Sequence, residues 1–135
     1  MAFAESGHTI ATEKIPFKPL APGVHMRVVY LDADTGSWTI MIRGEKGSVL
    51  PRHQHLAQAE IYILAGAGNH PQTGEFRTGD YVIEPPNAVH DELVQQEEML
   101  LIMRSSGPVA FLNDDGSTAF MMDVNMLEGF QAHAA

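Results

Sequence analysis

The chain has 135 residues, of which 44% are hydrophobic, and a formal net charge of −9. This length suits one domain with one core and is too short for two ordinary domains. With only eight lysines and arginines, the chain lacks the basic face that binds nucleic acid or an anionic membrane, so a small molecule is the expected partner. There is no cysteine, which excludes disulfides and thiolate metal sites, whereas seven histidines can supply nitrogen ligands.

Residues 1–22 show no clear hydrophobic period and are expected to form an N-terminal loop or edge segment ahead of the main domain, residues 23–135. Residues 1–14 also lack the basic and apolar order of a signal peptide. No apolar run in the chain approaches the roughly 20 residues that span a bilayer. We therefore expect a cytoplasmic protein.

Turn signals rich in Gly, Pro, Asn and Asp recur at short intervals from residue 22 to residue 116. Apolar and β-branched segments lie between them, at residues 26–31, 37–43, 59–65, 80–85, 97–104, 108–112 and 118–122. Short strands between frequent turns are typical of an antiparallel β-sandwich or barrel, so the predicted fold class is all-β. Residues 123–133 are predicted to form one short terminal helix.

The segment 60–64 is apolar on both faces of the predicted strand. Tyr62 and Leu64 share a face with Glu60, while Ile61 and Ile63 take the other face. Such a strand needs cover on both sides, and a second copy of the chain can supply one of the covers. The pattern therefore predicts a homodimer.

The residues that point to chemistry are His53, His55, Glu60 and His90. In an extended strand His53 and His55 project from the same face, so both rings can converge on one ion. Residues 56–59 allow a reversal into an antiparallel partner strand, on whose inner face Glu60 can bring a carboxylate oxygen to the same point. His90 follows the turn at residues 85–87 and completes the set.

Three imidazoles and one carboxylate suit Fe(II), Mn, Ni, Co or Zn, and ligand type does not choose among these ions. Four protein ligands leave one or two positions open on a five- or six-coordinate metal, where a substrate or dioxygen can bind. Glu60 is interpreted either as a ligand or as a nearby base that orients a histidine. His70 follows a glycine turn and has two interpretations, a residue that lines the pocket or, more simply, a residue on a strand surface.

The arrangement resembles the first motif of the cupin superfamily, in which a glycine, a His-x-His pair and a glutamate follow one another at fixed spacing. Gly47, His53, His55 and Glu60 match this motif, and the final glycine position falls on Ala67, between two glycines. The resemblance implies a jelly-roll β-sandwich or barrel that holds one divalent metal ion.

The second cupin motif is matched by Gly79, Pro85 and His90. The chain departs from it at Asn87, which replaces a glycine, and at Val94, which replaces an asparagine. Asparagine tolerates a positive φ better than most residues, so Asn87 can still form the turn. Val94 is not at a ligand position, and the predicted metal site survives both departures.

More narrowly, residues 23–130 resemble the small cupins that include acetylacetone-cleaving and 2,4'-dihydroxyacetophenone dioxygenases. Short matches lie at residues 37–39, before the first motif, and at residues 111–116, near the end of the chain. This resemblance implies a non-haem Fe(II) held mainly by His53, His55 and His90, and an enzyme that uses dioxygen to cleave a carbon–carbon bond in a small diketone or hydroxy-ketone. The resemblance does not decide whether Glu60 is a ligand.

Two other functions remain open because a fold does not fix a chemistry. In the first, the metal acts as a Lewis acid in an isomerase or lyase reaction, with Glu60 as the catalytic base. In the second, the domain is a non-catalytic ligand sensor, since similar cupin domains occur fused to anti-sigma regulators.

Overall fold

The computed structural model describes residues 7–132 and shows a mostly β protein with one short helix at the end of the chain. Residues 1–6 of the expected N-terminal segment and His133 of the expected helix lie outside the described residues. None of the helices within the described range is long and apolar enough to cross a bilayer.

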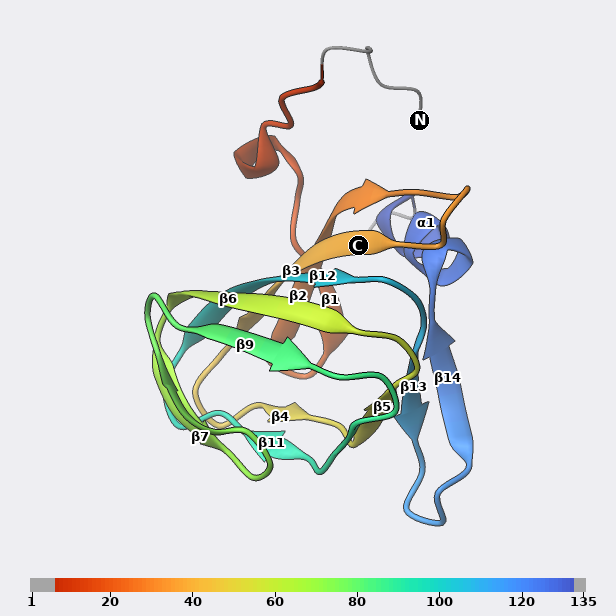
Figure 1. Ribbon diagram of the computed structural model, residues 1–135. Helices are drawn as coiled ribbons and strands as arrows, with labels where there is room; N and C mark the ends of the chain where they lie inside the picture. The colour runs from red at the N-terminus through yellow and green to blue at the C-terminus, as the bar shows by residue number, and fades with distance from the viewer. Residues whose placement is uncertain (1–6, 133–135) are drawn as a thin grey trace.

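A six-stranded antiparallel sheet forms one layer of the molecule (Figure 1). Its strands stand in the order β1-β2-β3-β12-β6-β9, with the bounds Lys18–Ala21, Val24–Leu31, Trp38–Gly44, Met99–Ser105, Ala59–Ala65 and Tyr81–Glu84. The edge strand β1 follows a short 3-10 helix, η1, at Thr12–Lys14. Every central strand of this sheet overlaps an apolar segment that the sequence pattern predicts.

The facing layer is built from shorter strands. Four of them stand in the order β10-β5-β13-β14, with the bounds Val89–His90, His53–His55, Val109–Leu112 and Thr118–Met122. Two further pairs complete this side, namely β4 with β11 (Val49–Leu50 and Leu93–Val94) and β7 with β8 (Ala67–His70 and Gly74–Arg77). The strands enclose an interior between the two layers, as in a cupin β-sandwich (Figure 1).

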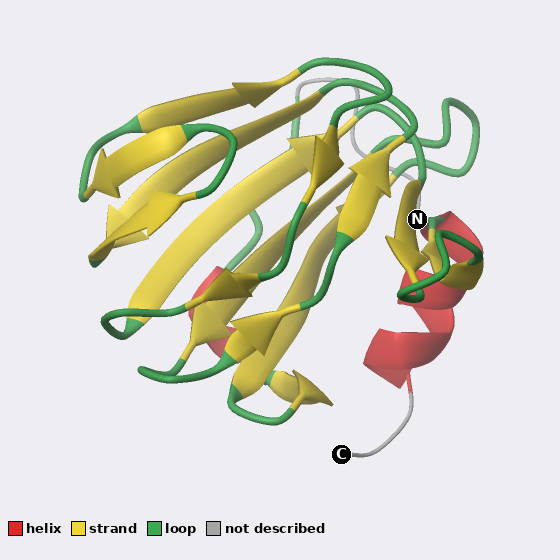
Figure 2. Cartoon of the chain, turned by 90° about the horizontal axis from the view of Figure 1, so that it is seen from below, coloured by secondary structure: helices red, strands yellow, loops and turns green. Residues whose placement is uncertain are grey.

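The C-terminal helix α1, Val124–Ala132, covers one end of the β structure (Figure 2). It begins after Asp123, whose Oδ1 accepts a hydrogen bond of 2.9 Å from the backbone N–H of Met126. This side-chain bond satisfies one of the free N–H groups of the first helical turn. Leu127 then inserts into the core and is fully buried. The helix itself confirms the predicted short terminal helix.

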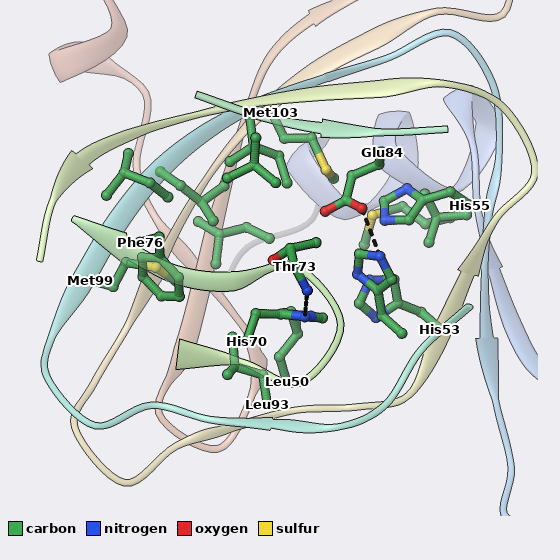
Figure 3. A pocket seen from close by; sticks show the side chains of 18 of the residues that line it. Leu50, His53, His55, His70, Thr73, Phe76, Glu84, Leu93, Met99 and Met103 are labelled. Atoms are coloured by element: carbon green, nitrogen blue, oxygen red, sulfur yellow. Dashed lines mark hydrogen bonds and ion pairs between the residues drawn. The ribbon is translucent and has the colours of Figure 1, made fainter. Parts of the chain in front are cut away.

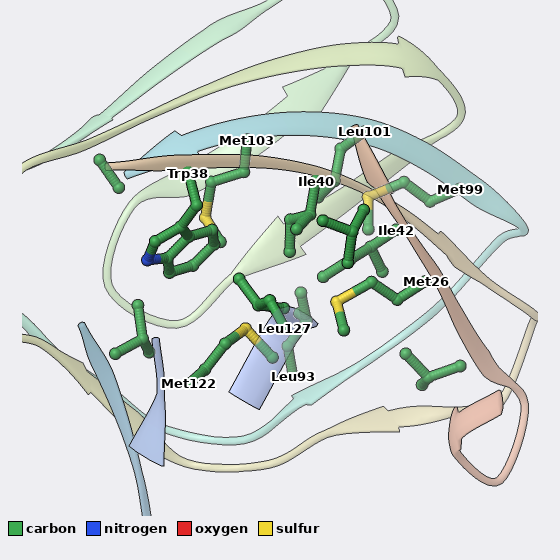
Figure 4. Close-up of a cluster of buried hydrophobic side chains, with 14 of the residues drawn as sticks. Met26, Trp38, Ile40, Ile42, Leu93, Met99, Leu101, Met103, Met122 and Leu127 are labelled. Carbon is green, nitrogen blue, oxygen red and sulfur yellow. The ribbon is translucent and has the colours of Figure 1, made fainter. Parts of the chain in front are cut away.

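One cluster of buried side chains holds the two layers together, and it includes Trp38, Met26, Ile40, Met122 and Leu127 (Figure 4). Each of these five side chains is 1% exposed or less. Members of the cluster stand at every second position along β2 and β3, as the period of two in a strand requires. Arg27 and Met41, which lie on the other face of the sheet, are also buried. The pocket described below is lined in part by the same cluster, which contributes Met122 and several other side chains to its walls.

Candidate metal centre

His53 and His55 lie on β5 with both rings turned into the interior. Both side chains are buried, while Gln54 between them is partly exposed. The predicted orientation of these two histidines on one face of an extended strand is therefore confirmed. Phe111 pairs with His53 on the neighbouring strand β13, and its ring packs 5.5 Å from the His53 ring.

His90 reaches the same point from β10, because β10 pairs with β5 in a register that sets His90 opposite His53. The turn before β10 contains Asn87, whose φ is +72°, and the backbone N–H of Asn87 donates a hydrogen bond of 2.6 Å to the His55 carbonyl. Asn87 thus forms the turn that a glycine forms in the motif, as predicted.

The three rings are close enough to share one ion. Their centroids are 5.0 to 5.2 Å apart, and the three candidate ligand atoms lie within 4.8 Å of one another. Among residues 7–132, these three histidines form the one group of histidine, aspartate or glutamate side chains that lie close enough together to hold a metal ion. The group sits in a pocket with three other polar residues, His70, Thr73 and Glu84 (Figure 3).

The hydrogen bonds that the rings make show which of their nitrogens are free to bind a metal ion. The Nδ1–H of His53 donates to the Pro51 carbonyl at 2.9 Å, which leaves the Nε2 lone pair free. Both ring nitrogens of His55 are buried, and neither has a hydrogen-bond partner within the described part of the chain. A buried nitrogen without a partner is costly, and a metal ion would satisfy it. The donor set fits a borderline divalent ion.

Burial keeps these rings uncharged. Desolvation lowers the pKa of His55 to about 4, and the neighbouring His53 adds to this effect. Desolvation likewise lowers the pKa of His53. Since a metal binds the neutral form of imidazole, the pocket presents these histidines at neutral pH in the state that a metal requires.

Glu60 does not join this group. Strand β6 pairs with β12 and β9 in the six-stranded sheet, so it is not the partner strand of β5 that the sequence pattern suggested. Ala59 begins β6 as a fully buried residue, and alternation then turns Ile61 and Ile63 into the interior. The side chain of Glu60 therefore lies on the outer face, where it is hydrogen-bonded to Tyr81.

The carboxylate in the pocket belongs to Glu84, which the sequence motifs did not identify. Glu84 is 3% exposed at the end of β9, and its Oε2 lies 2.6 Å from Nε2 of His90. The dashed line from Glu84 in Figure 3 marks this contact. Val82 shares the inward face with Glu84, whereas Tyr81 and Ile83 face outward. The sequence signal that could have identified Glu84 is a carboxylate in an otherwise apolar strand, just before the Pro-Pro turn.

The remaining walls of the pocket are apolar. They come from both layers of the sandwich, and they include Ile42, Leu50, Ile61, Ile63, Phe76, Val82, Leu93, Met99, Leu101 and Met103. A pocket with apolar walls and a few convergent polar groups is typical of a site for a small organic molecule. The interior therefore contains both the three histidines that can bind a metal ion and an apolar pocket beside them.

Solved structures with the same fold include two described as acetylacetone dioxygenases. The putative enzyme from Methylibium petroleiphilum PM1 has a TM-score of 0.88 at 20% identity, over 98% of this chain and 99% of that one. The enzyme from Acinetobacter johnsonii has a TM-score of 0.83 at 19% identity, over 97% of this chain and 93% of that one. At this identity the likeness shows the fold.

A third similar structure is the anti-sigma factor ChrR from Rhodobacter sphaeroides, solved in complex with SigE. Its TM-score is 0.60 at 19% identity, over 69% of this chain and 49% of that one. No curated protein matches the sequence significantly. Residues 5–110, however, match the model of the ChrR cupin-like domain family. This chain is therefore a member of the ChrR cupin-like domain family.

Proposed function

We propose that the protein is a metal-dependent dioxygenase that cleaves a carbon–carbon bond in a small diketone or hydroxy-ketone. The observation that carries the proposal is the group of three buried histidines in an apolar pocket, with both nitrogens of His55 lacking a partner among the described residues. The likeness in fold to two acetylacetone dioxygenases supports it. We propose His53, His55 and His90 as the ligands and Fe(II) as the metal.

When bound, Fe(II) would supply the redox chemistry that couples dioxygen to an organic substrate. The protein's own part is to hold the ligands and the substrate in place. The bond from His53 to the Pro51 carbonyl fixes its ring and its tautomer. The apolar walls exclude water from the space beside the histidines, which strengthens each electrostatic interaction there.

A diketone or hydroxy-ketone becomes an enolate by losing a proton, so the pocket needs a group that accepts this proton. The sequence pattern offered Glu60 as a base, but its outward position removes it from the pocket. We assign the proton-accepting role to Glu84, because its buried carboxylate is beside His90 and lines the pocket. Positioned general bases of this kind typically contribute about 10²- to 10⁴-fold to a rate.

The same contact favours a second candidate function. A carboxylate next to a metal-binding group can serve an isomerase or lyase in which the metal is a Lewis acid and dioxygen takes no part. A third candidate is a ligand-sensing domain without turnover, and membership of the ChrR cupin-like family favours it. These two functions differ from the first in their need for oxygen and in their product.

Oxygen consumption by Fe(II)-loaded protein separates the three functions. The assay uses a panel of β-diketones and hydroxyacetophenones, with Zn(II)-loaded protein as the control for uptake that needs no redox metal. We expect uptake in the iron form alone and two cleavage products from each molecule consumed. Product formation without dioxygen would favour the Lewis-acid reaction. Binding without turnover, in protein with measured iron, would favour the sensor.

A further inference from the structure

His70 is the remaining histidine in the pocket, and its tautomer is set by the backbone around it. The backbone N–H groups of Gln72 and Thr73 both donate to Nδ1 of His70, at 3.1 and 3.3 Å. An imidazole nitrogen that accepts two N–H groups carries no proton. The proton of the neutral ring is therefore on Nε2, so the ring can offer a donor there and no acceptor.

The ring that carries this donor lines the pocket beside the candidate metal centre. His70 is 8% exposed, and its ring centroid lies 4.4 Å from that of His90. Its Nε2 is buried and has no hydrogen-bond partner among residues 7–132. Figure 3 shows His70 and Thr73 together on one wall of the pocket that also holds His53, His55 and Glu84. A buried N–H without an acceptor costs free energy unless a ligand supplies the acceptor.

The turn that follows His70 is hydrogen-bonded to the residue that follows His90. The side chain of Gln72 donates to Oδ2 of Asp91 at 2.6 Å, and the Gln72 Oε1 accepts from the backbone N–H of Asp91 at 3.0 Å. Asp91 follows His90 directly in the chain. This pair of hydrogen bonds keeps His70 in a fixed place relative to the three histidines, as a positioning residue requires.

We propose that His70 is a positioning residue whose Nε2–H donates a hydrogen bond to an oxygen atom of the small ligand held at the three-histidine group. The proposal rests on the proposed metal centre and adds a condition on the substrate. Because the donor cannot also accept, the ligand must present an acceptor oxygen, such as that of an enolate or another oxyanion, on the His70 side of the pocket.

Two substitutions separate the donor from the structural role of the ring. His70→Asn retains an acceptor at the place of Nδ1, because an Asn side chain commonly accepts the backbone N–H two residues on, and it removes the donor at Nε2. His70→Gln places an amide N–H near the position of Nε2 and so retains a donor. The probe is acetohydroxamate, an anion that chelates metals through two oxygens, and the protein is loaded with Zn(II).

We expect calorimetric titration to show acetohydroxamate bound about 10- to 100-fold more weakly by His70→Asn than by wild type, the usual effect of losing one hydrogen bond to a charged group. His70→Gln should remain within about fivefold of wild type, since a retained donor retains most of this interaction. Zinc content should be equal in all three proteins. In wild type, ¹⁵N shifts should show His70 protonated at Nε2 and unprotonated at Nδ1.

Equal affinity in wild type and His70→Asn would overturn the proposal, as would a proton on Nδ1. If both variants weaken binding equally, the ring matters for the shape of the pocket and the donor role is wrong. Failure of zinc-loaded wild type to bind the probe would overturn this inference, and failure of the wild type to retain zinc would overturn the metal centre as well. Failure of oxygen uptake with normal hydroxamate results would overturn the dioxygenase function and leave the role of His70 standing.

Discussion

The metal-free protein is expected to become less stable as the pH falls from 7.5 to 5.5. Desolvation lowers the pKa of both His55 and His70 to about 4, whereas the unfolded chain has an ordinary histidine pKa of about 6.5. Below pH 6.5 the unfolded state binds protons that the folded state excludes. The stability that these buried neutral rings contribute is therefore fully present above pH 6.5, and it is lost progressively as the pH falls toward 4.

The size of the effect follows from the two buried rings. Each group that only the unfolded state protonates costs about 1.4 kcal/mol of stability per pH unit below 6.5. His55 and His70 together should lower the free energy of unfolding by about 2 to 3 kcal/mol between pH 7.5 and 5.5. His53, whose pKa is also lowered by burial, changes stability in the same direction. Carboxyl groups with ordinary pKa values near 4 remain ionised over most of this range and add little.

Urea unfolding in the presence of EDTA measures this change, and fluorescence of Trp38 reports it, because Trp38 is the single tryptophan and is 1% exposed. His55→Leu removes one of the titrating rings and keeps an apolar side chain of similar volume in the pocket. It should reduce the pH dependence by about 1 to 1.5 kcal/mol, the share of one ring. An unfolding free energy that is the same at pH 7.5 and 5.5 in the wild type would refute the reasoning.

Three further outcomes are expected. His53→Ala or His90→Ala should sharply lower bound metal, measured by mass spectrometry of the dialysed protein, with an unchanged circular dichroism spectrum; metal content equal to wild type would disprove the site. Glu84→Gln should lower turnover about 10²- to 10⁴-fold at normal metal content, whereas Glu60→Gln should leave both unchanged, and the reverse result would restore Glu60 to the site. Light scattering should give twice the chain mass of 14.8 kDa, because the outer face of β6 and β9 exposes several large apolar side chains, and a monomer would contradict the predicted homodimer.

The sequence by itself determined the longer strands, the terminal helix and the shared orientation of two histidines. Apolar segments of five or more residues correspond to β2, β3, β6, β9, β12, β13 and β14, because a long run with turns at both ends has few alternatives to a strand. His53 and His55 share a face by the local period of the strand alone. The conformation of Asn87 was likewise predictable, because it is a property of one residue type in one turn.

The very short strands β4, β7, β8, β10 and β11 were not predicted. Each has two to four residues, and none carries a repeated pattern of its own. The extended conformation of several of them is stabilised by partner strands that are distant in the sequence, as for β4 with β11. A propensity summed over so few residues is too weak to show this pairing.

The tertiary structure alone decided which carboxylate faces the histidines. A strand with apolar residues on both faces shows which residues share a side, but it does not show which side turns inward. In β6 the inward side is that of Ile61, so Glu60 faces outward, and in β9 the inward side is that of Val82, so Glu84 enters the pocket. His70 is buried for the same kind of reason, because the β7–β8 hairpin lies against the segment that follows His90, and only the folded chain brings these two segments together.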